Sequence, residues 1–171
     1  MSTAMDRVNP FFAASTLPFQ APPFDRIQES DFLPAIEEGM RQQMIEIAQI
    51  IDNPASPTFR NTLVELEKSG ALLSRVMHAF SAITGANTSD ALQKVQEDLA
   101  PKLAAHHDAI YLNRRLFERV ESIHAQRDAL DLDAESRRLL DWYCNDVFVQ
   151  KGAILSEADK AKLKKMNEEE S

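Results

Sequence analysis

The chain has 171 residues, of which 44% are hydrophobic and 27% are charged, a composition typical of one soluble domain. A chain of this length buries roughly 70% of the surface that its unfolded form exposes, so its core needs no disulfide or metal. Cys144 is the only cysteine, which excludes an internal disulfide. The formal net charge of -8 argues against nucleic acid as a partner, and the scarcity of glycine argues against a turn-dense all-β fold.

The chain carries no sequence signal for a membrane or for secretion. No run approaches the roughly 20 apolar residues that span a bilayer, so we predict no membrane partner. The first twelve residues mix acid and base and have no continuous apolar segment of the kind a signal peptide requires. We therefore expect a cytoplasmic protein in which Cys144 is a reduced, buried thiol.

Residues 1–29 are predicted to form an arm that precedes the helices. Prolines prevent a long helix there, and the segment is too aromatic for a solvated tail. We expect an extended arm whose phenylalanines pack on the folded body; a partly disordered terminus is the alternative. The residues on which this prediction depends are Pro10, Pro18, Pro22 and Pro23, with Phe11, Phe12, Phe19 and Phe24.

Residues 30–171 are predicted to form an all-α domain, an antiparallel bundle of about five to six helices joined by short connections. The first helix is capped by Ser30 and ends before Asn53-Pro54. A second helix starts at Thr62 or a turn earlier. Gly70 lies on the apolar stripe of this second helix, which predicts a close contact with another helix at that point.

Capping residues predict the remaining helices. The third helix begins at one of residues 88–90 and contains Pro101, which predicts either a kink near Asp98 or two separate helices. The last three helices begin at Asn113, Asp133 and Ser156. The final helix is marginal because its only large apolar side chains are Leu163 and Met166, which we expect to form a contact with a missing partner.

The four histidines do not form a recognisable metal-binding pattern. A two-histidine zinc helix needs the ligands four residues apart, and no pair here has that spacing. The two adjacent histidines point about 100° apart around a helix. We therefore interpret all four as exposed or rim side chains rather than ligands: His78, His106, His107 and His124.

No other group of residues predicts catalysis or cofactor binding. Cys144 lacks the neighbours that lower a thiol pKa, and neither Ser69 nor Ser74 fits the strand–turn–helix elbow of a serine nucleophile. Acid pairs and lysines are interpreted as solvated helix surfaces: Glu37-Glu38, Glu97-Asp98, and Lys160, Lys162, Lys164 and Lys165. The residues alone thus predict no catalytic, cofactor-binding or metal site in this chain.

Several long runs of the chain nevertheless resemble one enzyme family. They are NPFFAASTLPFQAPPFDRI (residues 9–27), DFLPAIEEGMRQQ (31–43), NPASPTFRNTLVELEKSGALLSRV (53–76), ANTSDALQKVQEDLAPKLAAHHDAIYLN (86–113) and LSEADKAKLKKMNEEES (155–171). In order and spacing they resemble the bacterial peptidyl-dipeptidases of the thimet oligopeptidase and neurolysin family of zinc metallopeptidases. The resemblance covers nearly the whole chain.

The resemblance implies that this chain is the N-terminal part of a longer metallopeptidase. Family members are several times longer, and their zinc is held by an H-E-x-x-H helix and a later glutamate. This sequence has no H-E-x-x-H, so no metal or catalytic residue of the family can be assigned to it. We expect zinc in the parent enzyme and no cofactor in this chain.

The resemblance also implies a function. The helices are expected to form one wall of a narrow channel in an enzyme that releases C-terminal dipeptides from short peptides, and to be inactive alone. The implied partners are the catalytic half and, in the parent, short peptides; a homodimer of the isolated chain is a further expectation. The alternative is an autonomous helical protein-interaction module, which a reading frame continuing past Ser171 into an H-E-x-x-H segment would exclude.

Overall fold

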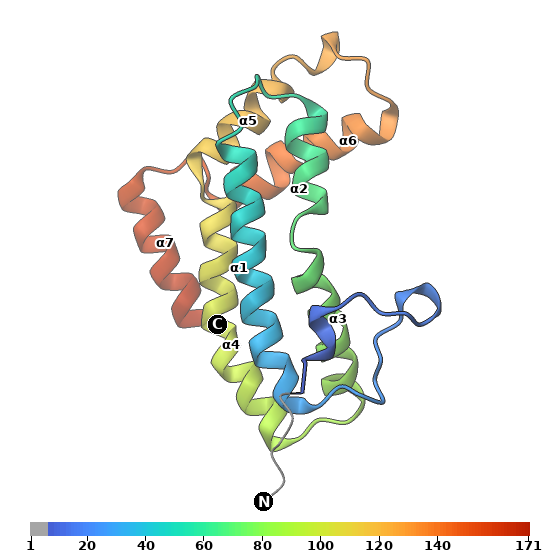
Figure 1. Cartoon of the computed structure of the whole chain (residues 1–171). Helices are drawn as coiled ribbons and strands as arrows, with labels where there is room; N and C mark the ends of the chain where they lie inside the picture. The colour runs from blue at the N-terminus through green and yellow to red at the C-terminus, as the bar shows by residue number, and fades with distance from the viewer. Residues whose placement is uncertain (1–6) are drawn as a thin grey trace, which may run out of the picture. The chain divides into compact units, whose positions relative to one another are not determined.

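A computed structural model describes residues 7–171, and Figure 1 shows its helices in chain order. These residues form helices, short turns and loops without a strand, so the predicted all-α fold is confirmed. The chain divides into two compact units, one comprising residues up to 43 with 70–99, the other residues 44–69 with 100–171. The predicted division into an arm (1–29) and a helical domain (30–171) stays a prediction.

Unit 1 is built around an aromatic core. It contains the beginnings of α1 (Phe32–Ile51) and α4 (Asp90–Tyr111), all of α3 (Ala71–Ala86), and the short turns η1 (Pro10–Phe12), η2 (Pro18–Gln20) and η3 (Glu29–Asp31). The Phe32 ring lies between Phe11 and Phe80, with ring centroids 5.4 and 5.2 Å apart. All three rings are buried, which joins the first turn, α1 and α3 into one core.

The close contact predicted at Gly70 is present, because a Cβ there would lie 2.5 Å from the Gln43 side chain on α1, and a second close approach occurs at Gly39. A Cβ at Gly39 on α1 would lie 2.8 Å from the Leu73 backbone on α3, so only glycine permits this approach. Gly70 has a φ of +73° and precedes α3, so the predicted continuous second helix is wrong. The left-handed backbone at Gly70 ends one helical segment and starts the next, beside the side chain of Gln43.

Unit 2 contains the remaining helices around one hydrophobic cluster. Its buried members include Ile47, Leu63, Ile110, Phe117 and Phe148. Its elements, besides the ends of α1 and α4, are the π-helical segment η4 (Phe59–Val64), α2 (Glu65–Lys68), α5 (Arg114–His124), η5 (Arg127–Ala129), α6 (Ala134–Trp142), the π-helical segment η6 (Tyr143–Val149) and α7 (Glu157–Glu170).

The predicted caps of the last three helices are confirmed. Asn113 accepts a hydrogen bond from the Leu116 N–H at 3.1 Å, Asp133 from Ser136 at 2.7 Å, and Ser156 from Asp159 at 3.2 Å. Each side chain satisfies a backbone N–H that the first helical turn leaves unpaired. The local sequence is sufficient to fix these three helix starts.

Of two other helix starts, the first differs from the prediction and the second confirms it. Ser30 lies inside η3, and the Asp31 carboxylate accepts from the Gln28 N–H at 2.7 Å just before α1 begins. The second helical segment starts a turn before Thr62, where Thr58 and Asn61 form reciprocal side-chain-to-backbone bonds of 3.1 and 2.8 Å.

Pro101 lies inside α4, which is one continuous helix, so the alternative of two separate helices is wrong. The kink near Asp98 stays a prediction. Among residues 7–171, none of the helices combines the length and the apolarity that crossing a membrane requires.

The phenylalanines before residue 30 do not all pack on the helices. Phe11 is 2% exposed, as expected, but Phe12 and Phe24 are about half exposed and Phe19 is fully exposed. The prediction of four buried rings is therefore wrong for three of them. The chain turns at η2, where Phe19 and Gln20 have positive φ, and this loop projects away from α3 (Figure 1).

Candidate functional site

Two of the four histidines, His106 and His107, are adjacent on α4. Within residues 7–171, no three His, Cys, Asp or Glu side chains come close enough to hold a metal ion. His78 is exposed on α3, where its Nδ1 lies 3.4 Å from Ser74 Oγ. His124 Nε2 lies 3.0 Å from Asp141 Oδ1 in unit 2. That this chain lacks a metal site stays a prediction.

His106 corrects the expectation that every histidine is exposed or at a rim. It is 7% exposed, because it lies on the inner face of α4. Burial, followed by the charge of His107, lowers its pKa below the ordinary value. The adjacent His107 points into a surface groove, and the two ring centroids are 6.3 Å apart.

The groove beside His107, called here the α4–α7 groove, has a volume of about 420 Å³. Its wall is held by Asn167 Nδ2 on α7, which donates a hydrogen bond to Asp108 Oδ1 on α4 at 2.8 Å. The lining residues lie on α4, just before α7 and on α7: Ala104, His107, Asp108, Tyr111, Leu112, Gln150, Lys151, Leu163 and Asn167.

One cation and one carboxylate, Lys151 and Asp108, line this groove. Lys151 Nζ lies 4.9 Å from the centre of the Tyr111 ring, a cation–π contact. Partial burial, followed by the positive charge of Lys151, lowers the pKa of His107, which favours its neutral form. The groove offers polar groups of both charges to a small polar molecule, since Asp108 also lines it, but its lining offers no serine or cysteine as a nucleophile.

A buried tyrosine near this groove was not singled out from the sequence. The Tyr143 hydroxyl at the start of η6 donates a short hydrogen bond to Glu67 on α2. Burial, followed by this bond to Glu67, raises the pKa of Tyr143 far above its ordinary value. No local signal could have found the pair, because 76 positions separate the two residues in sequence.

Cys144, next to Tyr143, is the buried thiol that the sequence predicted. It is 6% exposed, and burial raises its pKa, which keeps it a protonated thiol at neutral pH.

The serines and acid pairs are engaged in local contacts. Ser69 Oγ donates a hydrogen bond to the Leu66 carbonyl at 2.7 Å. Hydrogen bonds from Arg41 and Gln42 lower the pKa of Glu38 to about 2, the opposite of what a general acid needs. Glu97 and Asp98 are exposed on α4, as expected for a solvated face.

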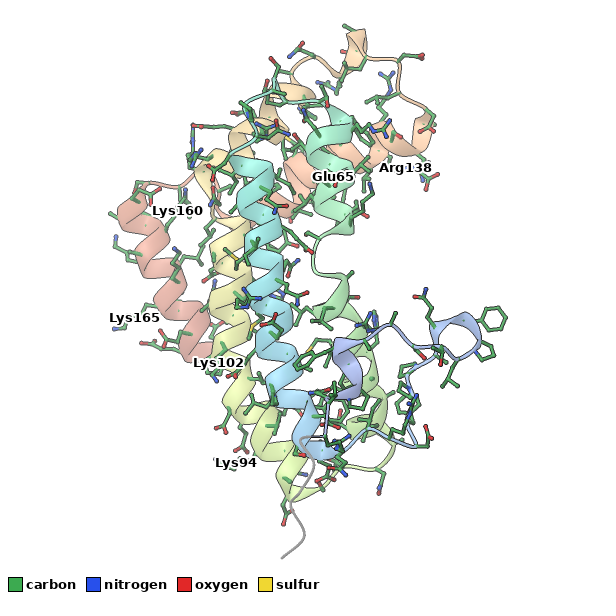
Figure 2. All side chains as sticks on the ribbon, in the orientation of Figure 1. Glu65, Lys94, Lys102, Arg138, Lys160 and Lys165 are labelled. Atoms are coloured by element: carbon green, nitrogen blue, oxygen red, sulfur yellow. The ribbon has the colours of Figure 1, made fainter. Side chains whose placement is uncertain are left out.

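One lysine of α7 departs from the prediction of a solvated surface. Lys160 is 2% exposed, and its Nζ lies 3.1 Å from Glu157 Oε1, whereas Lys165 is exposed on the same helix (Figure 2). Lys160 shares a helix face with Leu163 and Asn167, which line the groove. A sequence assignment that counts only apolar residues misses this burial, because a lysine stem can pack as an apolar chain.

The geometry alone does not identify relatives of this chain, but sequence similarity to known proteins does. No family model matches the chain. The chain is 50% identical over 161 residues to the dipeptidyl carboxypeptidase of Salmonella typhimurium (strain LT2) and 47% identical over 165 residues to that of Escherichia coli (strain K12). These matches cover 94% and 96% of this chain. The chain is related to the dipeptidyl carboxypeptidases.

The matched relatives are much longer than this chain. The chain spans 24% of each dipeptidyl carboxypeptidase that it matches. The identity of 47% to 50% over almost the whole chain confirms the resemblance seen in the sequence.

Proposed function

We propose that this chain is the N-terminal helical part of a zinc-dependent dipeptidyl carboxypeptidase that releases C-terminal dipeptides from short peptides in the cytoplasm. The observation that carries the proposal is 50% identity over 94% of the chain with one such enzyme. Identity at this level over almost every helix supports a shared fold and a shared place in the enzyme.

In this proposal the chain supplies structure rather than chemistry. The described residues do not fit a zinc site, because no three potential ligands gather and the sequence has no H-E-x-x-H. The zinc-binding residues then belong to the rest of the enzyme. The helices of this chain form one wall of a narrow channel, which admits short unfolded peptides and excludes folded proteins.

The chain alone is expected to release no dipeptide and to hold no stoichiometric zinc. The test uses the purified chain, stripped with a chelator and then resupplied with zinc, and an N-blocked tetrapeptide as substrate. Chromatography measures dipeptide release, and elemental analysis measures the metal content. One tightly held zinc per chain that restores dipeptide release would contradict the proposal.

A replacement experiment tests the positive half of the proposal. In the Escherichia coli relative, this chain replaces the matching segment of 165 residues, which gives a full-length chimera. The chimera should release dipeptides with a kcat/KM within about tenfold of the parent, because the wall is 47% identical. The unmodified relative is the control. A chimera that unfolds at the parental temperature yet releases no dipeptide would refute the proposed place in the enzyme.

A further inference from the structure

The segment before α1 displays an apolar surface that nothing in the described chain covers. We call it the arm surface: Val8, Phe12, Leu17, Phe19 and Phe24, of which Phe19 is 104% and Val8 75% exposed. No residue from 8 to 24 is charged, although 27% of the whole chain is. Solvated loops are normally polar, so an uncharged aromatic loop is unusual for a surface that stays in water.

The base of this segment is fixed to unit 1. Arg7 Nη2 lies 2.5 Å from the Asp31 carboxylate, and Asn9 Nδ2 donates to the Asp31 carbonyl at 2.8 Å. Arg75 on α3 donates to the Phe11 carbonyl at 2.7 Å, and the Phe11 ring is buried. The arm surface is therefore presented from a defined anchor.

The loop beyond the anchor has a defined conformation and presents its aromatic side chains outward. Ser15 Oγ donates to the Ala21 carbonyl at 2.6 Å and closes the loop. A cavity of about 590 Å³ beside the loop is lined by Val8 but by none of the other arm-surface residues. Phe19 has a φ of +57°, a backbone conformation rare for a bulky side chain, and its ring touches solvent on all sides. Hydrogen bonds from the Gln20 N–H to the Leu17 carbonyl at 3.0 Å and from the Ala21 N–H to the Pro18 carbonyl at 3.2 Å hold this turn, and they leave the Phe19 ring fully exposed.

We propose that the arm surface docks on the part of the peptidase polypeptide that lies outside this chain. This inference rests on the proposed function. The matched relatives are about four times as long as the segment they share with this chain, so most of the enzyme is absent from this structure. The central part of a protein interface is poor in charge and rich in aromatic residues, as residues 8–24 are.

A second copy of this chain is a less suitable occupant. Each copy carries a formal charge of -8, so two copies repel each other. Docking within one polypeptide also avoids the entropy cost of bringing two separate molecules together, because the linked parts are already held at high effective concentration.

Hydrogen exchange tests the docking. The backbone amides of residues 12–24 are compared in the isolated chain and in the full-length chimera with the Escherichia coli relative. We expect exchange at least about tenfold slower in the chimera, because docking buries the loop. Equal exchange in a chimera whose α5 amides are protected as in the isolated chain would overturn the inference. Protection of residues 12–24 in a chimera without peptidase activity would instead refute only the proposed function.

Two double variants identify the surface. Phe19→Ser with Phe24→Ser should lower the melting temperature of the isolated chain no more than the control below, because Phe24 is half exposed, and should restore fast exchange of residues 12–24 in the chimera. The matched control is Ile45→Ser with Ile154→Ser, two apolar residues 45% and 54% exposed elsewhere on the chain, which should leave the arm protected. Arm protection that survives Phe19→Ser with Phe24→Ser would overturn the inference.

Sedimentation of the chimera distinguishes the occupants. A monomer with a protected arm supports docking within one polypeptide. A dimer that dissociates when Phe19 and Phe24 are replaced would show that a second copy covers the arm surface, and would overturn the inference.

Discussion

Arg119 on α5 has a structural task that the sequence does not reveal. It is 8% exposed, and its guanidinium donates to the Asn53 carbonyl at 3.0 Å and to Asn61 Oδ1 at 3.3 Å. It thereby holds the turn between α1 and η4, while its Nε has no partner and burial lowers its pKa. This buried cation has no carboxylate partner and is stabilised instead by backbone carbonyls and the Asn61 side-chain oxygen.

Replacing Arg119 by methionine should destabilise the fold. The change leaves the carbonyls of the turn without their donor, which costs about 1–3 kcal/mol of unfolding free energy. Urea unfolding measures the loss. The control is Arg115→Met, which removes an exposed ion pair with Asp52 and should cost less than about 1 kcal/mol. Equal losses in the two variants would show that Arg119 does not hold the turn.

His106 should make stability depend on pH. Its folded pKa is lowered from 6.5, so between that lowered value and pH 6.5 the folded chain binds fewer protons than the unfolded chain. Stability is therefore fully present above pH 6.5 and is lost as the pH falls through this window. His107 contributes in the same direction, since its pKa is also lowered.

The measurement is the unfolding free energy at pH 7.5 and at pH 5.5. His106→Gln should reduce the difference between the two values, whereas His78→Gln, at an exposed position on α3, should not. An unchanged difference in His106→Gln would mean that the buried imidazole is not the group that titrates.

At the scale of helices, the sequence predicts what local chemistry decides. The caps at Asn113, Asp133 and Ser156 are correct because each side chain bonds to the backbone three residues on. The break at Gly70 is missed because the apolar stripe continues from Leu66 to Leu73 across it. Periodicity cannot detect a left-handed residue whose position depends on packing elsewhere in the unit.

The same limit applies to the candidate site. Cys144 is correctly predicted as buried, because small thiols usually are. The α4–α7 groove joins residues 104–112 to residues 150–167, and no motif links them. The prediction for the arm is wrong for a related reason. Aromatic content predicts that a side chain is buried, but it does not indicate whether the surface that buries it belongs to this chain.

Two glycines test the close approach of α1 and α3. Gly39→Ala should destabilise the chain, because its Cβ would lie 2.8 Å from the Leu73 backbone, which cannot move aside as a flexible side chain can. Overpacking of this kind costs about 1–3 kcal/mol. Gly85→Ala is the control: a Cβ there meets nothing within 4 Å, so the higher helix propensity of alanine should add up to about 1 kcal/mol. Thermal unfolding of both variants gives the answer, and a stabilised Gly39→Ala would contradict the contact.

At the scale of the whole molecule, two apolar surfaces are candidates for self-association of the isolated chain. The predicted homodimer through Leu163 and Met166 stays a prediction; Met166 is 55% exposed, while Leu163 is half-buried beside Gly152. The arm surface is the second.

The isolated chain should associate more strongly as salt rises. Its net charge of -8 repels a second copy at low salt, and roughly 1 M salt shortens the screening length to about 3 Å. Sedimentation velocity at low and high salt measures the effect. Replacing Leu163 and Met166 by serine, or Phe19 and Phe24 by serine, then shows which surface is responsible. Association that weakens with salt would point to ion pairs instead of apolar contact.

The absence of lysine and arginine from residues 8–24 also determines which proteases can cleave this segment. Trypsin cuts after lysine or arginine, so it finds a site at Arg7 and the next at Arg26, and nothing between them. A chymotrypsin-like enzyme finds Phe12, Phe19 and Phe24, all at least half exposed on a loop, where nicking concentrates. Residues 8–24 are therefore resistant to proteases that cut after basic residues and susceptible to those that cut after aromatic residues. Cleavage there would separate the anchor at Phe11 from α1.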